Sequence, residues 1–111
     1  MLERELKSLN CGNLTELQHL SCCDNELVSL SLSGCFSLKV IRCQNNKLKE
    51  LDVSQTTLRG GDYYYQNPLY CAPMETLEAL YLKDGWQNMV DGINKNRSPD
   101  YIPETTQIFY K

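Results

Sequence analysis

Hydrophobic and polar positions recur with a period of 21 residues from residue 6 onward. One unit reads L-x-x-L-x-[LVC]-x-x-x-x-x-L-x-x-[LI]-x-C-x-x-N-x. A unit with so few apolar residues cannot bury a core alone, whereas stacked units bury a continuous column. The positions that we expect to stack from unit to unit are Leu6, Leu27 and Leu48; Leu9, Leu30 and Leu51; Leu17 and Leu38; Leu20 and Ile41; Cys22 and Cys43; and Asn25, Asn46 and Asn67.

This pattern predicts a leucine-rich repeat solenoid with short parallel β-strands. The L-x-C segment alternates with period 2 and therefore predicts a strand, whose neighbours one unit away pair at a spacing of about 4.8 Å. The asparagine follows where the chain must turn inward, and its amide can both donate to and accept from unpaired backbone groups. The other half of the unit, L-x-x-L-x-L, leaves no room for an ordinary helix, so we expect extended or 3₁₀ segments there.

The pattern degrades after residue 58, where Gly60 and Gly61 replace leucines and tyrosines 63–65 occupy the expected strand. Further along, residues 77–82 predict a strand that ends at the turn signal Asp84-Gly85, residues 86–93 have helical spacing, and residues 105–111 predict a last strand. Terminal units of a solenoid must cover their own apolar face. We therefore expect one domain over residues 1–111, with repeats in 6–69 and a β-containing C-terminal cap in 70–111.

Two segments carry a resemblance to a known family. Residues 17–25 read LQHLSCCDN and residues 38–46 read LKVIRCQNN, followed by LKELDVS at 48–54. These segments resemble the short 21-residue leucine-rich repeats of bacterial surface proteins, the internalin-like type, over roughly residues 6–69. The resemblance implies a concave parallel sheet that binds other macromolecules, and a protein that is secreted or attached to the bacterial cell surface.

The composition of the chain limits the classes of protein to which we expect it to belong. The chain has 111 residues, of which 41% are hydrophobic and 23% charged, as in ordinary single globular domains. Its net charge of −3 provides no basic field for a phosphate backbone, so we expect no nucleic acid partner. No run approaches the roughly 18 apolar residues of a membrane span. The alternating charges of Met1 to Leu6 do not form the apolar core of a secretory signal.

The residues available for chemistry do not form a catalytic or metal site. His19 is the single histidine, and on a strand it would lie about 13 Å from Cys23, too far for a Cys–His dyad. The six cysteines contain no C-x-x-C pair, and zinc needs about four convergent ligands. Cys22 and Cys43 occupy leucine-type positions, where a bridge would be strained. We expect free, buried thiols, no metal, no cofactor and no enzymatic activity.

The outward residues of the L-x-C strands are the candidate binding surface. Arginine and tyrosine, which dominate binding hot spots, lie side by side there. The leading interpretation is a non-catalytic module that binds a protein, or a glycan, through this face. An alternative is that the tyrosines only cover the last units, and that the chain is the end segment of a longer repeat array that it caps. The candidate binding residues are His19, Ser21, Val40, Arg42, Gln44, Tyr63, Tyr65 and Tyr81.

The N-terminal unit has little in front of it to cover its apolar edge. Leu6, Leu9 and Cys11 lie at that edge with Leu2, and Met1 to Glu5 offer few apolar atoms. Unpaired strand edges are templates for association. The sequence therefore predicts either a homodimer through the N-terminal coil or a fragment of a longer solenoid.

Overall fold

The computed structural model describes residues 6–58, 68–87, 90 and 102–111. Within them the chain forms a small β-rich fold of short strands, and every strand pairing is parallel. The strands are β1 (Ser8–Asn10), β2 (His19–Ser21), β3 (Ser29–Ser31), β4 (Val40–Arg42), β5 (Glu50–Asp52), β6 (Leu69–Tyr70), β7 (Ala79–Leu82) and β8 (Gln107–Tyr110).

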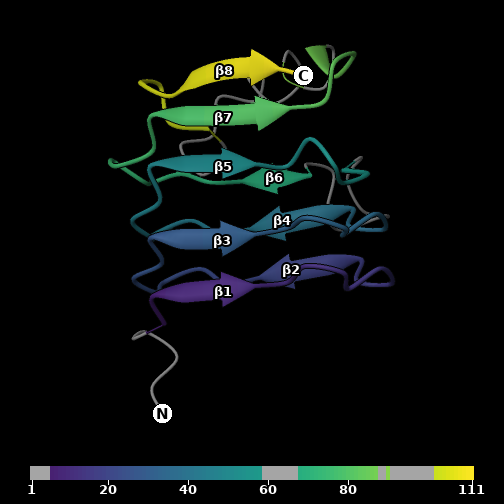
Figure 1. Ribbon diagram of the computed structural model, residues 1–111. Helices are drawn as coiled ribbons and strands as arrows, with labels where there is room; N and C mark the ends of the chain where they lie inside the picture. The colour runs from purple at the N-terminus through teal and green to yellow at the C-terminus, as the bar shows by residue number, and fades with distance from the viewer. Residues whose placement is uncertain (1–5, 59–67, 88–89, 91–101) are drawn as a thin grey trace.

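Consecutive strands alternate between two columns (Figure 1). The first column contains β1, β3, β5 and β7 and ends at β8, and the second contains β2, β4 and β6. Hydrogen bonds join them in the orders β1-β3, β2-β4-β6 and β5-β7-β8. Two parallel neighbouring strands must be joined by a crossover connection. Between β2 and β4, for example, this connection contains β3 of the first column.

The predicted L-x-C strands and their register are confirmed for the first two units. β2 pairs with β4, with His19 opposite Val40 and Leu20 opposite Ile41, which is a shift of 21 residues. The ladder continues after the strands, because the Cys22 N–H donates to the Arg42 carbonyl at 2.8 Å.

The other half of each unit is also a strand. Of the two expectations for these segments, the extended one is confirmed: they form β1, β3 and β5, and no 3₁₀ helix occurs in the described part of the chain. β1 pairs with β3 from Ser8↔Ser29 to Asn10↔Ser31, again with a shift of 21. In the L-x-L end of this segment, apolar and polar side chains alternate as they do in L-x-C. Its backbone can therefore pair with the strand one turn away in the same way.

The prediction for the third unit is wrong in register. A period of 21 would place Tyr63 beside Arg42, but the structure pairs Ile41 with Leu69 and Arg42 with Tyr70, 28 positions along the chain. Leu69, Tyr70 and Cys71 thus form the third L-x-C segment, and the boundary drawn between residues 69 and 70 falls inside β6. Asn67 lies outside the described residues, as do the three tyrosines of the predicted strand, 63–65.

Turn residues repeat with the strands. Asp24 and Asn45, one period apart, both have positive φ angles of 61° and 60° directly after the second-column strands. The Asn45 Nδ2 donates to the Asp24 Oδ1 at 2.7 Å. Asn13 and Gly34 form the equivalent pair after the first-column strands, with φ of 64° and 87°. Asparagine, aspartate and glycine are the residues that adopt this conformation at low cost.

The core lies between the two columns and contains most of the predicted ladder. Leu6, Leu9, Leu17, Leu20 and Leu30 are only partly buried, although they pack against it. The first four belong to the first turn of the chain, which has a described neighbour on one side only. The fully buried ladder residues are Cys22, Leu27, Leu38, Ile41, Cys43, Leu48 and Leu51.

The C-terminal strands are confirmed. β7 ends before the predicted turn, where Gly85 has a φ of 101°, and β8 pairs with β7 from Ala79↔Gln107 to Leu82↔Tyr110. Of the predicted helix, Gln87 and Val90 are helical, and the Val90 N–H donates to the Trp86 carbonyl at 3.2 Å. Its other residues beyond Gln87 lie outside the described part.

Asn46 joins two turns of the chain. Its Oδ1 accepts the Leu27 N–H at 3.0 Å, and its Nδ2 donates to the carbonyls of Cys22 and Cys43 at 3.0 and 2.9 Å. Asn25, one period earlier, donates only within its own turn, to the carbonyls of Cys22 and Cys23, and its buried Oδ1 has no partner. The predicted asparagine ladder is therefore complete at Asn46 and incomplete at Asn25.

Leu51 and Leu30 should differ in their contribution to stability. Leu51 is 1% exposed, whereas Leu30 is only partly buried. Replacing a well-packed core leucine with alanine costs about 2–5 kcal/mol. We expect Leu51→Ala to fall in this range and Leu30→Ala below it in urea unfolding. Equal losses would contradict the packing described here.

Asn46 and Asn25 offer a second matched comparison. Asn46→Ala removes the partner of the Leu27 N–H and the donors to the Cys43 and Cys22 carbonyls, of which the Cys22 carbonyl keeps Asn25, so it should lower the free energy of unfolding by roughly 2–4 kcal/mol. Asn25→Ala removes no bond between turns and should cost about 1 kcal/mol. Thermal and urea melts of both variants check this, and an Asn25→Ala loss as large as that of Asn46→Ala would refute it.

Candidate interaction surfaces

The outward side of the second column forms a surface that we call the Arg42 face, defined by His19, Ser21, Arg42, Gln44 and Tyr70. Arg42 and Tyr70 are directly opposite on β4 and β6, and the Arg42 guanidinium carbon lies 5.2 Å from the centre of the Tyr70 ring. His19 and Ser21 are exposed on β2. The register thus brings an arginine, an aromatic ring and small polar groups together.

Val40 does not belong to the accessible part of this face. It was predicted to be an outward binding residue, but it is 2% exposed and lies outside the hydrophobic core cluster. The side chain is therefore covered on the outer side of β4. Val40 contributes packing there and is not available to a partner.

Arg42 and Gln44 are partly buried and incompletely hydrogen-bonded. The Arg42 Nε and the Gln44 Oε1 are buried and have no hydrogen-bond partner. A buried polar atom without a partner is costly. One donor, at the last residue of β4, and one acceptor, two residues beyond it, are therefore buried without a hydrogen-bond partner.

Of the three tyrosines predicted for this face, Tyr81 lies elsewhere. Tyr81 lies on β7 in the first column, opposite Asp52 and Phe109, because the longer third turn shifts every later residue. Tyr63 and Tyr65 lie outside the described residues. Sequence reasoning missed Tyr70, although L-Y-C at 69–71 repeats the L-x-C signal.

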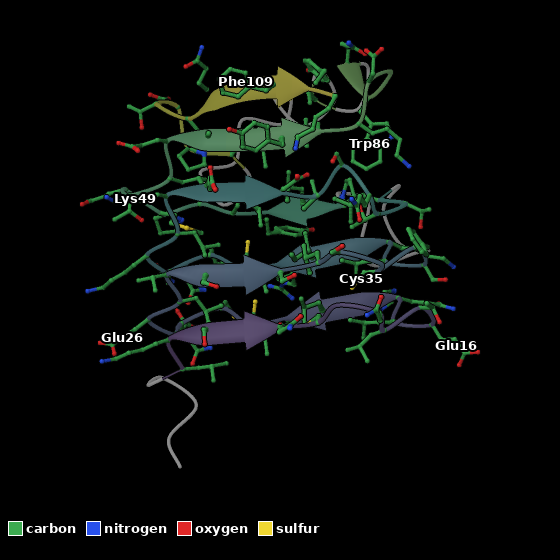
Figure 2. All side chains as sticks on the ribbon, in the orientation of Figure 1. Glu16, Glu26, Cys35, Lys49, Trp86 and Phe109 are labelled. Atoms are coloured by element: carbon green, nitrogen blue, oxygen red, sulfur yellow. The ribbon has the colours of Figure 1, made fainter. Side chains whose placement is uncertain are left out.

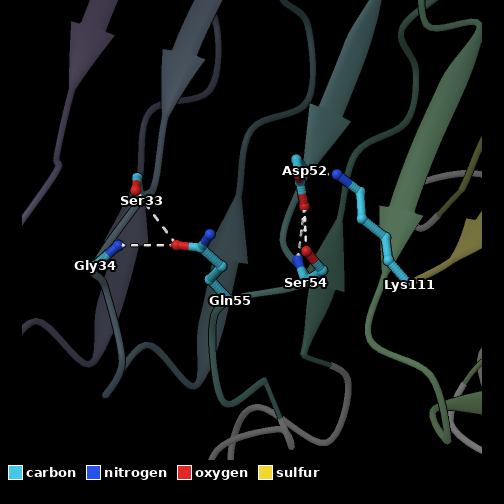
Figure 3. A network of polar contacts seen from close by, with 6 residues as sticks. All are labelled: Ser33, Gly34, Asp52, Ser54, Gln55 and Lys111. Carbon is cyan, nitrogen blue, oxygen red and sulfur yellow. Dashed lines mark hydrogen bonds and ion pairs between the residues drawn. The ribbon is translucent and has the colours of Figure 1, made fainter.

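A second surface lies on the outward side of the first column; we call it the Asp52 face, defined by Ser31, Asp52, Tyr81, Phe109 and Lys111. Lys111 extends from the end of β8 across Tyr81, with its Nζ 4.7 Å from the ring centre, and reaches the Asp52 Oδ2 at 2.8 Å (Figure 3). Tyr81 stacks on Phe109 with 5.3 Å between ring centres.

The Asp52 carboxyl is held in its charged form. Partial burial raises its pKa, but hydrogen bonds from Lys111 and Ser54 outweigh that effect and hold the pKa below its ordinary value. Both the Asp52 and Lys111 side chains are about half exposed, at 45% and 53%. Such a pair contributes little to stability, so its main effect is to fix where the Lys111 ammonium lies.

The first column is interrupted between β3 and β5, which are not paired. A hollow of about 230 Å³ lies at this interruption, lined by residues 30–33 with Asp52 and Gln55. The Gln55 Oε1 accepts bonds from the Gly34 N–H and the Ser33 hydroxyl, each at 3.3 Å (Figure 3). The Gln55 side-chain amide thus links two turns of the chain here, as backbone hydrogen bonds between paired strands do elsewhere in the column.

No disulfide joins the six cysteines, all of which lie in the described ranges, and five of them are buried, as the sequence predicted. Sulfur atoms lie between the columns (Figure 2). Burial raises the pKa of Cys22 to about 12 and raises that of Cys43 and Cys71 as well. Cys23 is the partly exposed thiol, 3.9 Å from the Ser21 hydroxyl oxygen. The buried thiols are protonated at neutral pH and behave as small apolar groups.

Other site types find little support in the described ranges. No group of three or more histidine, cysteine, aspartate and glutamate side chains there is arranged to hold a metal ion. None of the helices in that part of the chain has the length and apolar character required to cross a membrane.

Comparisons with known proteins give one partial likeness. The chain is 38% identical over 52 residues to the "Protein phosphatase PHLPP-like protein" of Drosophila melanogaster. The matched stretch covers 47% of this chain but only 6% of that protein. No family model matches the chain, and no solved structure matches it.

Thiol reactivity tests the burial of the cysteines. In the folded protein at pH 8, Cys23 should react with Ellman's reagent well before the other five, because reaction requires an accessible thiolate. Cys23→Ser should remove the fast phase, and all remaining thiols should react once the chain is unfolded in guanidinium. A fast phase of two or more thiols would contradict the structure.

Proposed function

We propose that this chain is a leucine-rich repeat solenoid of the internalin-like type and acts as a non-catalytic module that binds a protein partner. The 21-residue register of the first two turns, the L-x-C segments of β2, β4 and β6, and the resemblance of these segments to bacterial surface repeats support the proposal. Attachment to a bacterial cell surface is implied by that resemblance and is part of the proposal.

The observation that carries the binding role is the contact between Arg42 and Tyr70 on the Arg42 face. Arginine and tyrosine bury large, rigid areas and donate hydrogen bonds, and they are enriched at the centres of protein interfaces. The exposed His19 and Ser21 border this pair on β2.

A protein partner is favoured over a glycan and over a substrate. Arg42 occupies one face of the Tyr70 ring, which reduces the aromatic surface that a sugar ring could stack on. An enzymatic role would need an activated nucleophile. The buried cysteines have raised pKa values, and no base is placed against Cys23 by any described hydrogen bond.

A binding screen against surface and envelope proteins tests the proposal. A partner of the intact chain should lose at least about tenfold in affinity with Ser21→Arg, which adds bulk to an exposed position and corresponds to about 1.4 kcal/mol. Arg42→Ala should have a similar effect, with a melt to confirm that it folds. Val28→Arg, at a side chain that is 63% exposed in the first column, is the matched control and should bind normally. Unchanged binding by both face variants would refute the Arg42 face.

An alternative is that the chain is the end segment of a longer array. The unpartnered Asn25 Oδ1 favours it, because the equivalent Asn46 atom bonds to the preceding turn. The partly buried Leu6 and Leu9 mark the same end, although Cys11 is buried and not part of an open edge. A further repeat, or the N-terminal homodimer expected from the sequence, would cover these groups.

Extending the chain tests this alternative. A second copy of residues 17–37 fused ahead of Leu6 should raise the melting temperature, and it should raise the cost of Asn25→Ala towards that of Asn46→Ala. No gain on extension would argue against an array. For the homodimer, sedimentation should show a dimer that Leu9→Asp dissociates.

A further inference from the structure

The outward side chains of the first column change in character from turn to turn. They are small and polar on β1 and β3, whereas β5 carries two carboxylates, Glu50 and Asp52. On β7 and β8 they include the stacked rings of Tyr81 and Phe109. Among the outward strand positions that the structure describes in this column, Glu50 and Asp52 are the two charged ones. An acidic strand therefore lies between a polar surface and a pair of aromatic rings.

A cation already occupies the place where the acidic and aromatic parts meet. The Lys111 Nζ is 2.8 Å from the Asp52 Oδ2 and 4.7 Å from the centre of the Tyr81 ring. The hydrogen bond and charge of Asp52, with a smaller contribution from Glu50, raise the pKa of the Lys111 side chain. A carboxylate next to the face of an aromatic ring is an arrangement that binds ammonium groups. We call Asp52 and Tyr81 the ammonium site.

The ammonium site is fixed by several contacts, whereas its occupant is held weakly. Ser54 donates to the Asp52 Oδ1 from its N–H at 2.9 Å and from its hydroxyl at 2.6 Å, and Tyr81 stacks on Phe109. The Lys111 side chain is 53% exposed, and such an ion pair contributes at most about 1 kcal/mol. The Lys111 backbone bonds to Leu82 separately, so its side chain can leave while β8 stays paired.

Space for an incoming side chain lies beside Asp52. The hollow of about 230 Å³ borders this carboxylate on the side of β3, whereas Lys111 reaches it from the side of β8 (Figure 3). Because the Oδ1 already accepts two bonds from Ser54, an incoming ammonium would bind the Oδ2. Two ammonium groups at one oxygen repel each other. Binding at Asp52 therefore requires the Lys111 side chain to leave.

We propose that the Asp52 face binds a basic segment of a protein partner, one lysine of which replaces Lys111 on Asp52 and Tyr81. Lys111 is then an internal ligand that occupies the ammonium site in the free chain. Charge favours this occupant, because the carboxylates of Glu50 and Asp52 outnumber the Lys111 ammonium and the whole chain has a net charge of −3. The Arg42 face lies on the other column, so this proposal goes beyond the binding role of that face and does not depend on it.

Titration calorimetry of the intact chain at low ionic strength tests the proposal, because salt screens exposed charge pairs. The probe is a blocked peptide of lysine, serine and glycine, and its control is the same peptide with every lysine acetylated. The lysine peptide should bind at least about tenfold more tightly than the acetylated one, which cannot form the ion pair or the cation–π contact. Equal binding of both peptides, or binding of neither, would overturn the proposal.

Charge-matched variants test whether the peptide binds at the ammonium site. Asp52→Asn should weaken binding at least about fivefold, whereas Glu16→Gln removes the same charge on the bend before β2 and should have little effect (Figure 2). Lys111→Met removes the resident cation and should strengthen binding at least about threefold. Lys39→Met makes the same change directly before β4 and should not. Circular dichroism checks the fold of each variant. No difference within either pair would overturn the proposal.

Nuclear magnetic resonance follows Lys111 directly. In the free chain its methylene protons next to Nζ lie near the Tyr81 ring, so the ring current should shift them upfield. Saturation with the lysine peptide should move them towards the values of an unstacked lysine. A chain that binds the peptide while the Lys111 signals stay unchanged would refute the exchange. None of these outcomes alters the binding test of the Arg42 face, which uses other residues.

Discussion

The hydrogen bonds between successive turns of the chain are the constraint on which the rest of this structure depends. Each strand has only two to four residues, and a strand of that length has no stability of its own in water. It exists because the strand one turn away offers carbonyls and N–H groups at the same spacing. The leucines, the cysteines and the polar turn residues act by keeping that spacing constant.

Polar side chains at the bends supply the bonds that the strands cannot make. Asn46 satisfies the backbone of two turns where both strands of the second column have ended. Thr76 and Thr106 donate from one turn to the carbonyls of Leu48 and Leu77 in the preceding turn. Without such bonds, each bend would bury backbone N–H and carbonyl groups that have no partner. Their free-energy cost exceeds the stabilisation that the apolar contacts of so short a strand provide. Polar groups at bends are thus as necessary to this core as its leucines.

The sequence predicts the register of the strands only where its period is intact. Identical spacing gives identical register, so the pairings of β1 with β3 and β2 with β4 follow directly from the 21-residue shift. The extra residues before Leu69 have no counterpart in the first two turns, and sequence reasoning therefore carried the old register past them and put Tyr63 where Tyr70 lies. L-Y-C at 69–71 and L-E-A-L-Y-L at 77–82 contain the correct register, but only a search that allows insertions finds them.

The candidate surfaces were less predictable, because they arise where the period changes. A uniform repeat gives outward residues the same spacing in every turn, whereas a shift of 28 positions brings Tyr70 to Arg42 and one of 29 positions brings Tyr81 to Asp52. Val40 shows the limit of alternation: it points outward by pattern and is nevertheless covered. Lys111 contacts Asp52 across an intervening strand, 59 residues away in the sequence, and no local signal encodes that contact. The positions that repeat along the chain therefore form the stacked strands. The positions where the repeat changes determine which side chains lie on each face and at each end.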